Sequence, residues 1–366
     1  MSYVTRKALF EQIENLRERP LISYVTSIRP NLSGQMAGDS IDHIIEQIQQ
    51  IPSDKREIDF LIISNGGDPI TALRIISLLR ERFDKIAVLL PYVAYSAATI
   101  LSLGADEIIM HPYSNLGPVD PQLTVSRQAD NGQSAQLQFS SEDIRNYIDF
   151  VKTDVGITDQ DHLTSAFNAL AKEVGPLPIG SAKRSQQLSL SLSIKMLETH
   201  MEDKSKATSI AKALNTSYYH HGYAVSRSEA QNIGLNVITP DATLENLMWN
   251  VWQDYSAEMK CGYELNMVAA IMADPTAQAW MNSVNVINLP ANTPPQIAQN
   301  IIAAMAQNAA SMVPQPPIQL NELVASIESA RCAVAVHTTF NIVYWRDVNM
   351  ALAFNATAYS EGWKPV

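Results

Sequence analysis

The chain has 366 residues, of which 46% are hydrophobic, so it can bury a large core and form more than one domain. Its formal net charge is −11 and it has no basic cluster, which argues against nucleic acid as a partner. The two cysteines, Cys261 and Cys332, are too few for a disulfide scaffold and lack the spacing of metal ligands. We therefore expect reduced thiols, with a single Cys–Cys pair as the alternative. The sequence also has no P-loop, and we expect neither a cofactor nor a metal.

The first predicted element is an amphipathic helix over residues 3–16. It is too charged to span a bilayer and contains no apolar signal core. No later run approaches the length of a transmembrane helix. The sequence therefore predicts a cytoplasmic protein without a membrane partner.

Strand-like and helix-like segments alternate after this helix. Apolar, β-branched runs predict strands, and apolar residues at helical spacing predict helices. The predicted strands cover residues 21–26, 60–64, 86–90 and 107–110, and two predicted helices cover residues 41–51 and 69–83. This alternation favours an α/β fold with a mainly parallel sheet covered by helices.

A glycine pair follows the second predicted strand, in the run Ser64-Asn-Gly-Gly67. Asp68 then caps the next helix, with Pro69 at its first position. Paired glycines between a strand and a helix let the backbone approach a ligand with its N–H groups uncovered. An ordinary strand-to-helix turn is the alternative interpretation of the same pattern.

Ser96 follows the next strand and opens a run of small and aliphatic residues, 97–103. This position places the hydroxyl at a helix N-terminus, where unpaired N–H groups can stabilise a developing anion. A serine that begins a helix also commonly serves only as its N-cap. However, parallel neighbouring strands put the glycine turn and the Ser96 turn on one edge of the sheet. One turn can then hold a nucleophile while the other supplies oxyanion donors, which favours an enzyme site.

The segment after this core contains a hairpin and several helices. Residues 122–126 and 135–139, joined by a turn at 130–132, predict the hairpin. A helical region is expected over residues 141–214. Ser226 and Glu229 then form a capping box for a short helix that ends at Gly234.

Beyond Asp241 the pattern changes. An apolar stripe from Leu244 to Met259 predicts a helix that packs on its own core or at an oligomer contact. Proline-rich connections flank a further helix over residues 297–310. The tail contains strand-like runs at residues 331–337, 341–345 and 351–354, and it is expected to form a small α+β appendage. We therefore expect two domains, residues 1–240 and 241–366, the second without a readable role.

Several motifs, in this order and spacing, resemble the ClpP/crotonase superfamily. Within it the chain is most similar to the serine dehydrogenase proteinases, relatives of ClpP and of the SppA peptidases. The motifs are Ser64-Asn-Gly-Gly67, Tyr95-Ser-Ala-Ala-Thr99, Leu103-Gly-Ala-Asp-Glu-Ile108 and Leu116-Gly-Pro-Val-Asp-Pro-Gln122. The resemblance covers about residues 5–240. It implies the ClpP/crotonase fold of repeated ββα and βα units. It also implies an ATP-independent serine peptidase that acts on a peptide or protein substrate as a homo-oligomer.

The resemblance also implies the catalytic groups. ClpP carries its histidine near the position of Asp120 here, whereas the serine dehydrogenase proteinases have the order serine, aspartate, histidine. Carried across position by position, that order gives Ser96 as nucleophile, Asp120 as orienting acid and His221 as base. The backbone N–H groups of Gly67 and Ala97 would form the oxyanion hole.

Other groups compete for the role of the base. His220 is adjacent to His221, but only His221 fits the family's spacing of a histidine, one residue and a tyrosine. His111 follows a strand and is interpreted as a structural histidine. A serine–lysine dyad of the SppA type would need a desolvated lysine, for which Lys152 and Lys183 are the candidates by position.

Two other function classes are compatible with the same fold. A crotonase-like enzyme acting on an acyl-CoA would use two backbone donors for a thioester oxyanion without a serine nucleophile. A non-catalytic assembly protein would keep the fold alone.

Overall fold

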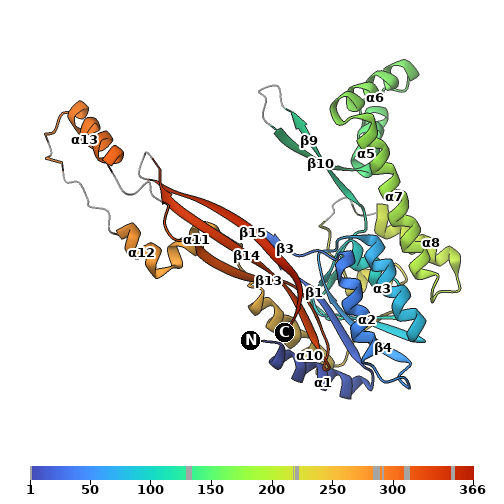
Figure 1. Ribbon diagram of the computed structural model, residues 1–366. Coiled ribbons are helices and arrows are strands. Elements are labelled where there is room, and N and C mark those ends of the chain that lie inside the picture. The colour runs from blue at the N-terminus through green and yellow to red at the C-terminus, as the bar shows by residue number, and fades with distance from the viewer. Residues whose placement is uncertain are drawn as a thin grey trace.

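The computed structural model describes residues 2–128, 134–216, 218, 222–282, 289–290, 292–308, 314–347 and 351–366. Its largest element is a sheet of eight strands in the order β12-β7-β5-β4-β1-β13-β14-β15. Figure 1 labels β4, β1, β13, β14 and β15 of this sheet. The first five of these are mutually parallel: β12 Val237–Ile238, β7 Glu107–Met110, β5 Lys85–Leu90, β4 Glu57–Ile63 and β1 Leu21–Thr26. The predicted α/β fold with a mainly parallel sheet is confirmed.

Helices cover both faces of the parallel part of the sheet, because alternate residues of each strand point to opposite faces. In β1, Ile22 and Tyr24 pack with one group of helices, whereas Leu21 and Val25 pack with the other. The first group is α2 Ile41–Gln49, α3 Pro69–Arg82, α4 Ala97–Ser102, α7 Pro176–Leu197 and α8 Lys204–Thr216. The second group is α1 Tyr3–Arg17 and α10 Ala242–Glu258. The apolar stripe of α10 therefore packs on the core of its own chain.

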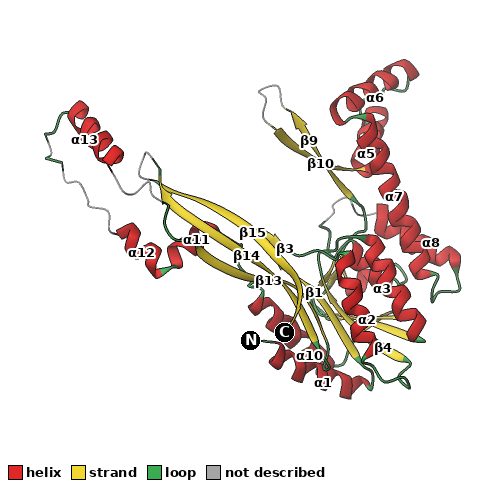
Figure 2. Cartoon of the chain, in the orientation of Figure 1, coloured by secondary structure: helices red, strands yellow, loops and turns green. Residues whose placement is uncertain are grey.

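The tail differs from the small α+β appendage expected for it. Its three strands are antiparallel and continue the main sheet: β13 Ile318–Glu328, β14 Ala333–Arg346 and β15 Leu352–Pro365 (Figure 2). Strand β13 pairs directly with β1, with Thr26 opposite Ala325. The strand-like runs 331–337 and 341–345 merge into the single strand β14. The physical reason is that β1 is fully buried, and a buried strand needs hydrogen-bond partners on both sides.

The remaining elements lie between or beside these layers. A hairpin of β9 Gln122–Gln128 and β10 Ser134–Ser140 matches the predicted one, and its turn lies outside the described residues. The other helices are α5 Ser141–Thr153, α6 Gln160–Val174, α9 Arg227–Asn232, α11 Met267–Ala273, α12 Pro275–Asn282 and α13 Pro295–Asn308, with a short 3-10 helix at Gly38–Ser40. The small strands are β2 Ile28–Arg29, β3 Leu32–Ser33, β6 Val93–Ala94, β8 Asn115–Leu116 and β11 Val225–Ser226. No helix in the described part of the chain is both long and apolar enough to cross a membrane.

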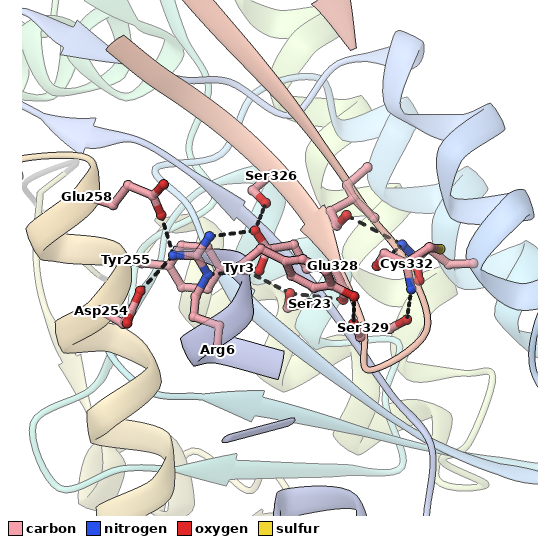
Figure 3. Close-up of polar contacts among 12 residues, drawn as sticks. Tyr3, Arg6, Ser23, Asp254, Tyr255, Glu258, Ser326, Glu328, Ser329 and Cys332 are labelled. Carbon is pink, nitrogen blue, oxygen red and sulfur yellow. Dashed lines mark hydrogen bonds and ion pairs between the residues drawn. The ribbon is translucent and has the colours of Figure 1, made fainter. Parts of the chain in front are cut away.

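The guanidinium of Arg6 ties α1 to both α10 and β13 (Figure 3). It donates hydrogen bonds to Glu328 at 2.8 and 2.7 Å and to Asp254 at 2.7 Å, and it contacts Glu258. The Arg6 Cζ atom lies 4.2 Å from the centroid of the Tyr255 ring. Arg6, Asp254 and Glu328 are almost completely buried, so each of these charges depends on its partners.

We expect Arg6→Met to lower the free energy of unfolding by about 3–5 kcal/mol, because it leaves buried carboxylates without their cation. The matched control is Arg56→Met, since Arg56 makes a similar two-point pair with Asp84 on the exposed surface. Its loss should change stability little. Urea unfolding of both variants measures the difference. Equal losses would show that burial of the Arg6 cluster is not what matters.

Candidate active site

A small three-stranded sheet, in the order β11-β8-β6, brings three distant segments together. Ala94 of β6 lies beside Leu116 of the parallel strand β8, and Leu116 lies opposite Val225 of the antiparallel strand β11. The chain leaves β6 toward Ser96 and leaves β8 toward Asp120, at the same end of the sheet. It enters β11 at that end from Gly222. The topology therefore directs three chain segments to one place.

Ser96 has an unusual backbone conformation, with φ 51° and ψ −117°. Positive φ is uncommon for a residue other than glycine and is strained unless the surroundings enforce it. Its half-buried side chain makes no capping hydrogen bond to α4. Asp68 is a useful contrast, because it caps α3 by accepting from the N–H groups of Ile70 and Thr71 at 3.0 and 3.2 Å. Ser96 therefore occupies the N-cap position without capping α4 through its side chain, and its backbone conformation is that of a strained strand-to-helix turn.

The glycine turn lies against the Ser96 turn. A Cβ atom on Gly66 would lie 2.6 Å from the carbonyl oxygen of Tyr95, 2.9 Å from Ser96 Cβ and 3.0 Å from the nitrogen of Ala97. Gly66 and Gly67 also have φ values of 103° and 146°, which side chains disfavour. Only glycine at position 66 lets the two turns approach this closely.

The two amides predicted for the oxyanion hole have no acceptor in the hydrogen-bond pattern of the described residues. Met36 pairs with the glycine turn through the Gly66 carbonyl and the Asp68 N–H, at 2.8 and 2.9 Å. The N–H of Gly67, which lies between these two groups in the chain, takes no part in this pairing. Within the described residues, neither that N–H nor the N–H of Ala97 donates a hydrogen bond. Both donors thus lack an acceptor in the described part of the chain; Gly67 is partly exposed, whereas Ala97 is buried.

Thr99 of α4 connects the segment that carries Asp120 to the segment before Ser96 through hydrogen bonds. The Thr99 hydroxyl lies 2.7 Å from the carbonyl oxygen of Ala94 and 2.9 Å from that of Gly117. The N–H of Gly117 donates to Ala94 at 2.9 Å, so the strand pairing continues past β8. Asp120 itself is 7% exposed and accepts a hydrogen bond from the Gln122 side chain at 3.1 Å. Sequence reasoning missed Thr99 as an organising residue, although it stands within a quoted motif.

His220 and His221 lie outside the described residues, so the predicted base is not placed. The residues on either side are described. Tyr218 and Tyr223 stack, with ring centroids 4.6 Å apart, and the Tyr223 hydroxyl donates to Glu229 at 2.8 Å. The two ends of this segment are therefore held together.

The competing bases occupy other environments. His111 is buried and stacks on Trp249 with a centroid distance of 5.0 Å, and its Nδ1 accepts from the N–H of Tyr113 at 3.2 Å. Burial lowers the pKa of His111 below its usual value. These contacts are those expected of a structural histidine. Lys152 and Lys183 are both exposed, so neither is desolvated as a lysine base must be.

Comparison with known proteins finds a family match over part of the chain. Residues 35–145 match the family model described as ClpP-like SDH-type serine proteinase. An uncharacterized protein of Methanocaldococcus jannaschii is 27% identical over 198 residues, which cover 54% of this chain and 59% of that protein. A second uncharacterized protein of the same organism is 37% identical over 82 residues, which cover 22% of this chain and 28% of that protein. The chain thus spans less than two thirds of the length of these relatives.

Two solved structures show low overall similarity. The 1510-N membrane-bound stomatin-specific protease, solved as a mutant, has a TM-score of 0.34 and 16% identity over 62% of this chain and 82% of that one. ClpP1 from Listeria monocytogenes has a TM-score of 0.33 and 12% identity over 64% of this chain and 99% of that one. The family match carries more information than these scores, because it covers Gly67, Ser96 and Asp120. Over residues 35–145 the chain matches the ClpP-like SDH-type serine proteinases, which confirms the resemblance seen in its sequence.

Proposed function

We propose that this chain is a serine peptidase in which Ser96 is the nucleophile, His221 the base and Asp120 the acid that orients it. The observation that carries the proposal is the strained turn at Ser96. The Ser96 hydroxyl does not cap α4, and the neighbouring N–H groups of Gly67 and Ala97 have no acceptor among the described residues. Support for Asp120 and His221 comes from chain direction. Asp120 lies four residues after Leu116, and His221 four residues before Val225, which pairs with Leu116.

In the proposed reaction, the His221 imidazole takes the proton of the Ser96 hydroxyl while Oγ bonds to the carbonyl carbon of the peptide. The N–H groups of Gly67 and Ala97 stabilise the resulting oxyanion, each by about 3 kcal/mol. The C–N bond then breaks, and the imidazolium gives its proton to the leaving amine. In the second half of the reaction, His221 takes a proton from a water molecule while the water oxygen bonds to the acyl carbon. The bond between that carbon and Ser96 Oγ then breaks, and the imidazolium returns its proton to Ser96. Asp120 holds the imidazole and stabilises its charged form.

The same observations weigh against the other function classes. A crotonase-like acyl-CoA enzyme would use the two backbone donors without needing a serine whose hydroxyl is withheld from capping the helix. A purely structural protein would gain nothing from the strain at Ser96. The serine–lysine dyad lacks support because its candidate lysines are exposed. A peptide or protein substrate, homo-oligomeric assembly and a cytoplasmic location complete the proposal, and they rest on the family resemblance and the composition.

A fluorophosphonate probe tests the catalytic residues directly. We expect the wild-type protein to form an adduct at Ser96, identified by mass spectrometry, and Ser96→Ala to form none. His221→Ala should slow labelling by about a thousand-fold or more, because the serine loses its base.

His220→Ala is the matched control for that experiment and should label at nearly the wild-type rate. The reverse result, with His220→Ala inactive and His221→Ala active, would reassign the base. An adduct-free wild-type protein would end the proposal.

Gly66→Ala should abolish labelling, because the added methyl group would press on Tyr95, Ser96 and Ala97. Gly156→Ala is the control, since Gly156 also has positive φ, 78°, but nothing lies within 4 Å of its added Cβ. It should cost about 1 kcal/mol of stability through backbone strain and leave labelling unchanged. Labelling rates and thermal midpoints of both variants decide the matter. Normal labelling of Gly66→Ala would contradict the close contact of the two turns.

His111 should affect stability and not reactivity. Because its pKa in the folded protein is lowered, the unfolded chain binds the proton more readily. The stabilisation is present above the unfolded pKa of about 6.5 and is lost as the pH falls below it. Thermal midpoints at pH 7.5 and 5.5 should therefore differ less for His111→Asn than for the wild type, with labelling at Ser96 retained. Loss of labelling in this variant would instead make His111 a rival base.

A further inference from the structure

Two buried hydroxyl groups meet where β1 and β4 end. Thr26 is the last residue of β1, and Ser64 follows the last residue of β4. The Thr26 hydroxyl donates to Ser64 Oγ at 2.8 Å, and both residues are at most 1% exposed. Buried hydroxyls stabilise a fold only when they are hydrogen-bonded, and apolar residues would fit these strand positions as well. The pair therefore calls for a reason beyond packing.

Ser64 Oγ in turn holds the glycine turn. It accepts a hydrogen bond from the N–H of Gly66 at 3.0 Å, and it lies 3.4 Å from the Gly66 carbonyl oxygen. That carbonyl also accepts from the N–H of Met36 at 2.8 Å. The Gly66 carbonyl and the Gly67 N–H belong to one planar trans peptide and point in opposite directions. Fixing the carbonyl toward Met36 and Ser64 therefore aims the Gly67 N–H away from them.

The backbone of Ser64 holds the other turn of the site. Its N–H donates to the carbonyl of Val93 at 3.0 Å, and its carbonyl accepts from the N–H of Tyr95 at 3.0 Å. These bonds fix the strand that leads directly into Ser96. One residue thus contacts both the turn that carries the Gly67 donor and the turn that carries the nucleophile.

From this geometry we propose that Thr26 and Ser64 are positioning residues for the oxyanion hole. Ser64 sets the direction of the Gly67 N–H relative to Ser96, and Thr26 holds Ser64 in the required rotamer. The inference rests on the proposed serine-peptidase function. Neither hydroxyl touches the substrate, so both residues act through the orientation of the Gly67 amide.

The test is the kinetics of phosphonylation by a fluorophosphonate, whose phosphoryl oxygen would occupy the oxyanion hole. Ser64→Ala should lower the maximal inactivation rate by about 10-fold or more, short of the roughly 10²–10³-fold cost of removing an oxyanion donor. The concentration for half-maximal rate should stay the same. The pH midpoint of the rate should also stay the same, because the base is unchanged. A merely structural defect would not separate these quantities in this way.

Thr26→Val tests the second member of the pair with an isosteric change. It should slow inactivation less than Ser64→Ala, and Thr26→Ser should restore the rate by restoring the hydroxyl. In the Ser64→Ala background, Thr26→Val should have no further effect, because Thr26 acts through Ser64. Ser40→Ala is the matched control: Ser40 is a fully buried residue whose hydroxyl donates to Ala37 at 2.7 Å, and its loss should leave the rate unchanged.

The outcomes separate the two proposals. A wild-type protein that is never labelled at Ser96 overturns the peptidase and the positioning pair together. Wild-type labelling that persists at the same rate in Ser64→Ala and Thr26→Val overturns the positioning pair alone. Additive effects of the two substitutions would also overturn it. If Ser64→Ala does not fold, the comparison of Thr26→Val with Thr26→Ser still decides.

Discussion

The alignment of β6 with β8 is the constraint on which the proposed site depends. Asn115 donates to Tyr92 at 2.8 Å and Gly117 donates to Ala94 at 2.9 Å, so the chain before Ser96 and the chain before Asp120 run side by side. Strand β11 adds the segment that follows His221 on the other side of β8. A shift of this register would separate the nucleophile from its proposed partners while leaving the large sheet intact.

The site is built mainly from backbone groups, which explains why small residues surround it. Gly66 allows contact between the turns, and Thr99 and Ser64 join neighbouring segments through single hydroxyls. Such a site is rigid because its donors belong to strands and helix ends packed in the core. Ser96 itself is half-buried.

The sequence could predict the elements whose signals are local. A few consecutive residues are enough to predict the β-branched strands β1, β4 and β5, the cap at Asp68 and the glycine pair. The antiparallel partner of β1 could not be predicted. This partner, β13, lies far along the chain, and pairing across that distance leaves no local pattern. The backbone conformation of Ser96 could not be predicted either, because the sequence does not distinguish a serine that caps a helix from one with positive φ. The roles of Asp120 and His221 stay predictions from the family resemblance.

The direction change at β1, parallel on one side and antiparallel on the other, has a consequence for biosynthesis. Strand β1 and Arg6 emerge from the ribosome early, but their partners in β13 follow about three hundred residues later, as the separation of 322 between Arg6 and Glu328 shows. Contacts this remote form slowly, since a long loop must close first. The nascent chain therefore carries an unpaired edge of β1 until residues 318–328 have been translated, and until then Arg6 lacks Glu328, one of its three carboxylate partners. Premature termination would yield fragments prone to aggregation rather than a shortened working protein.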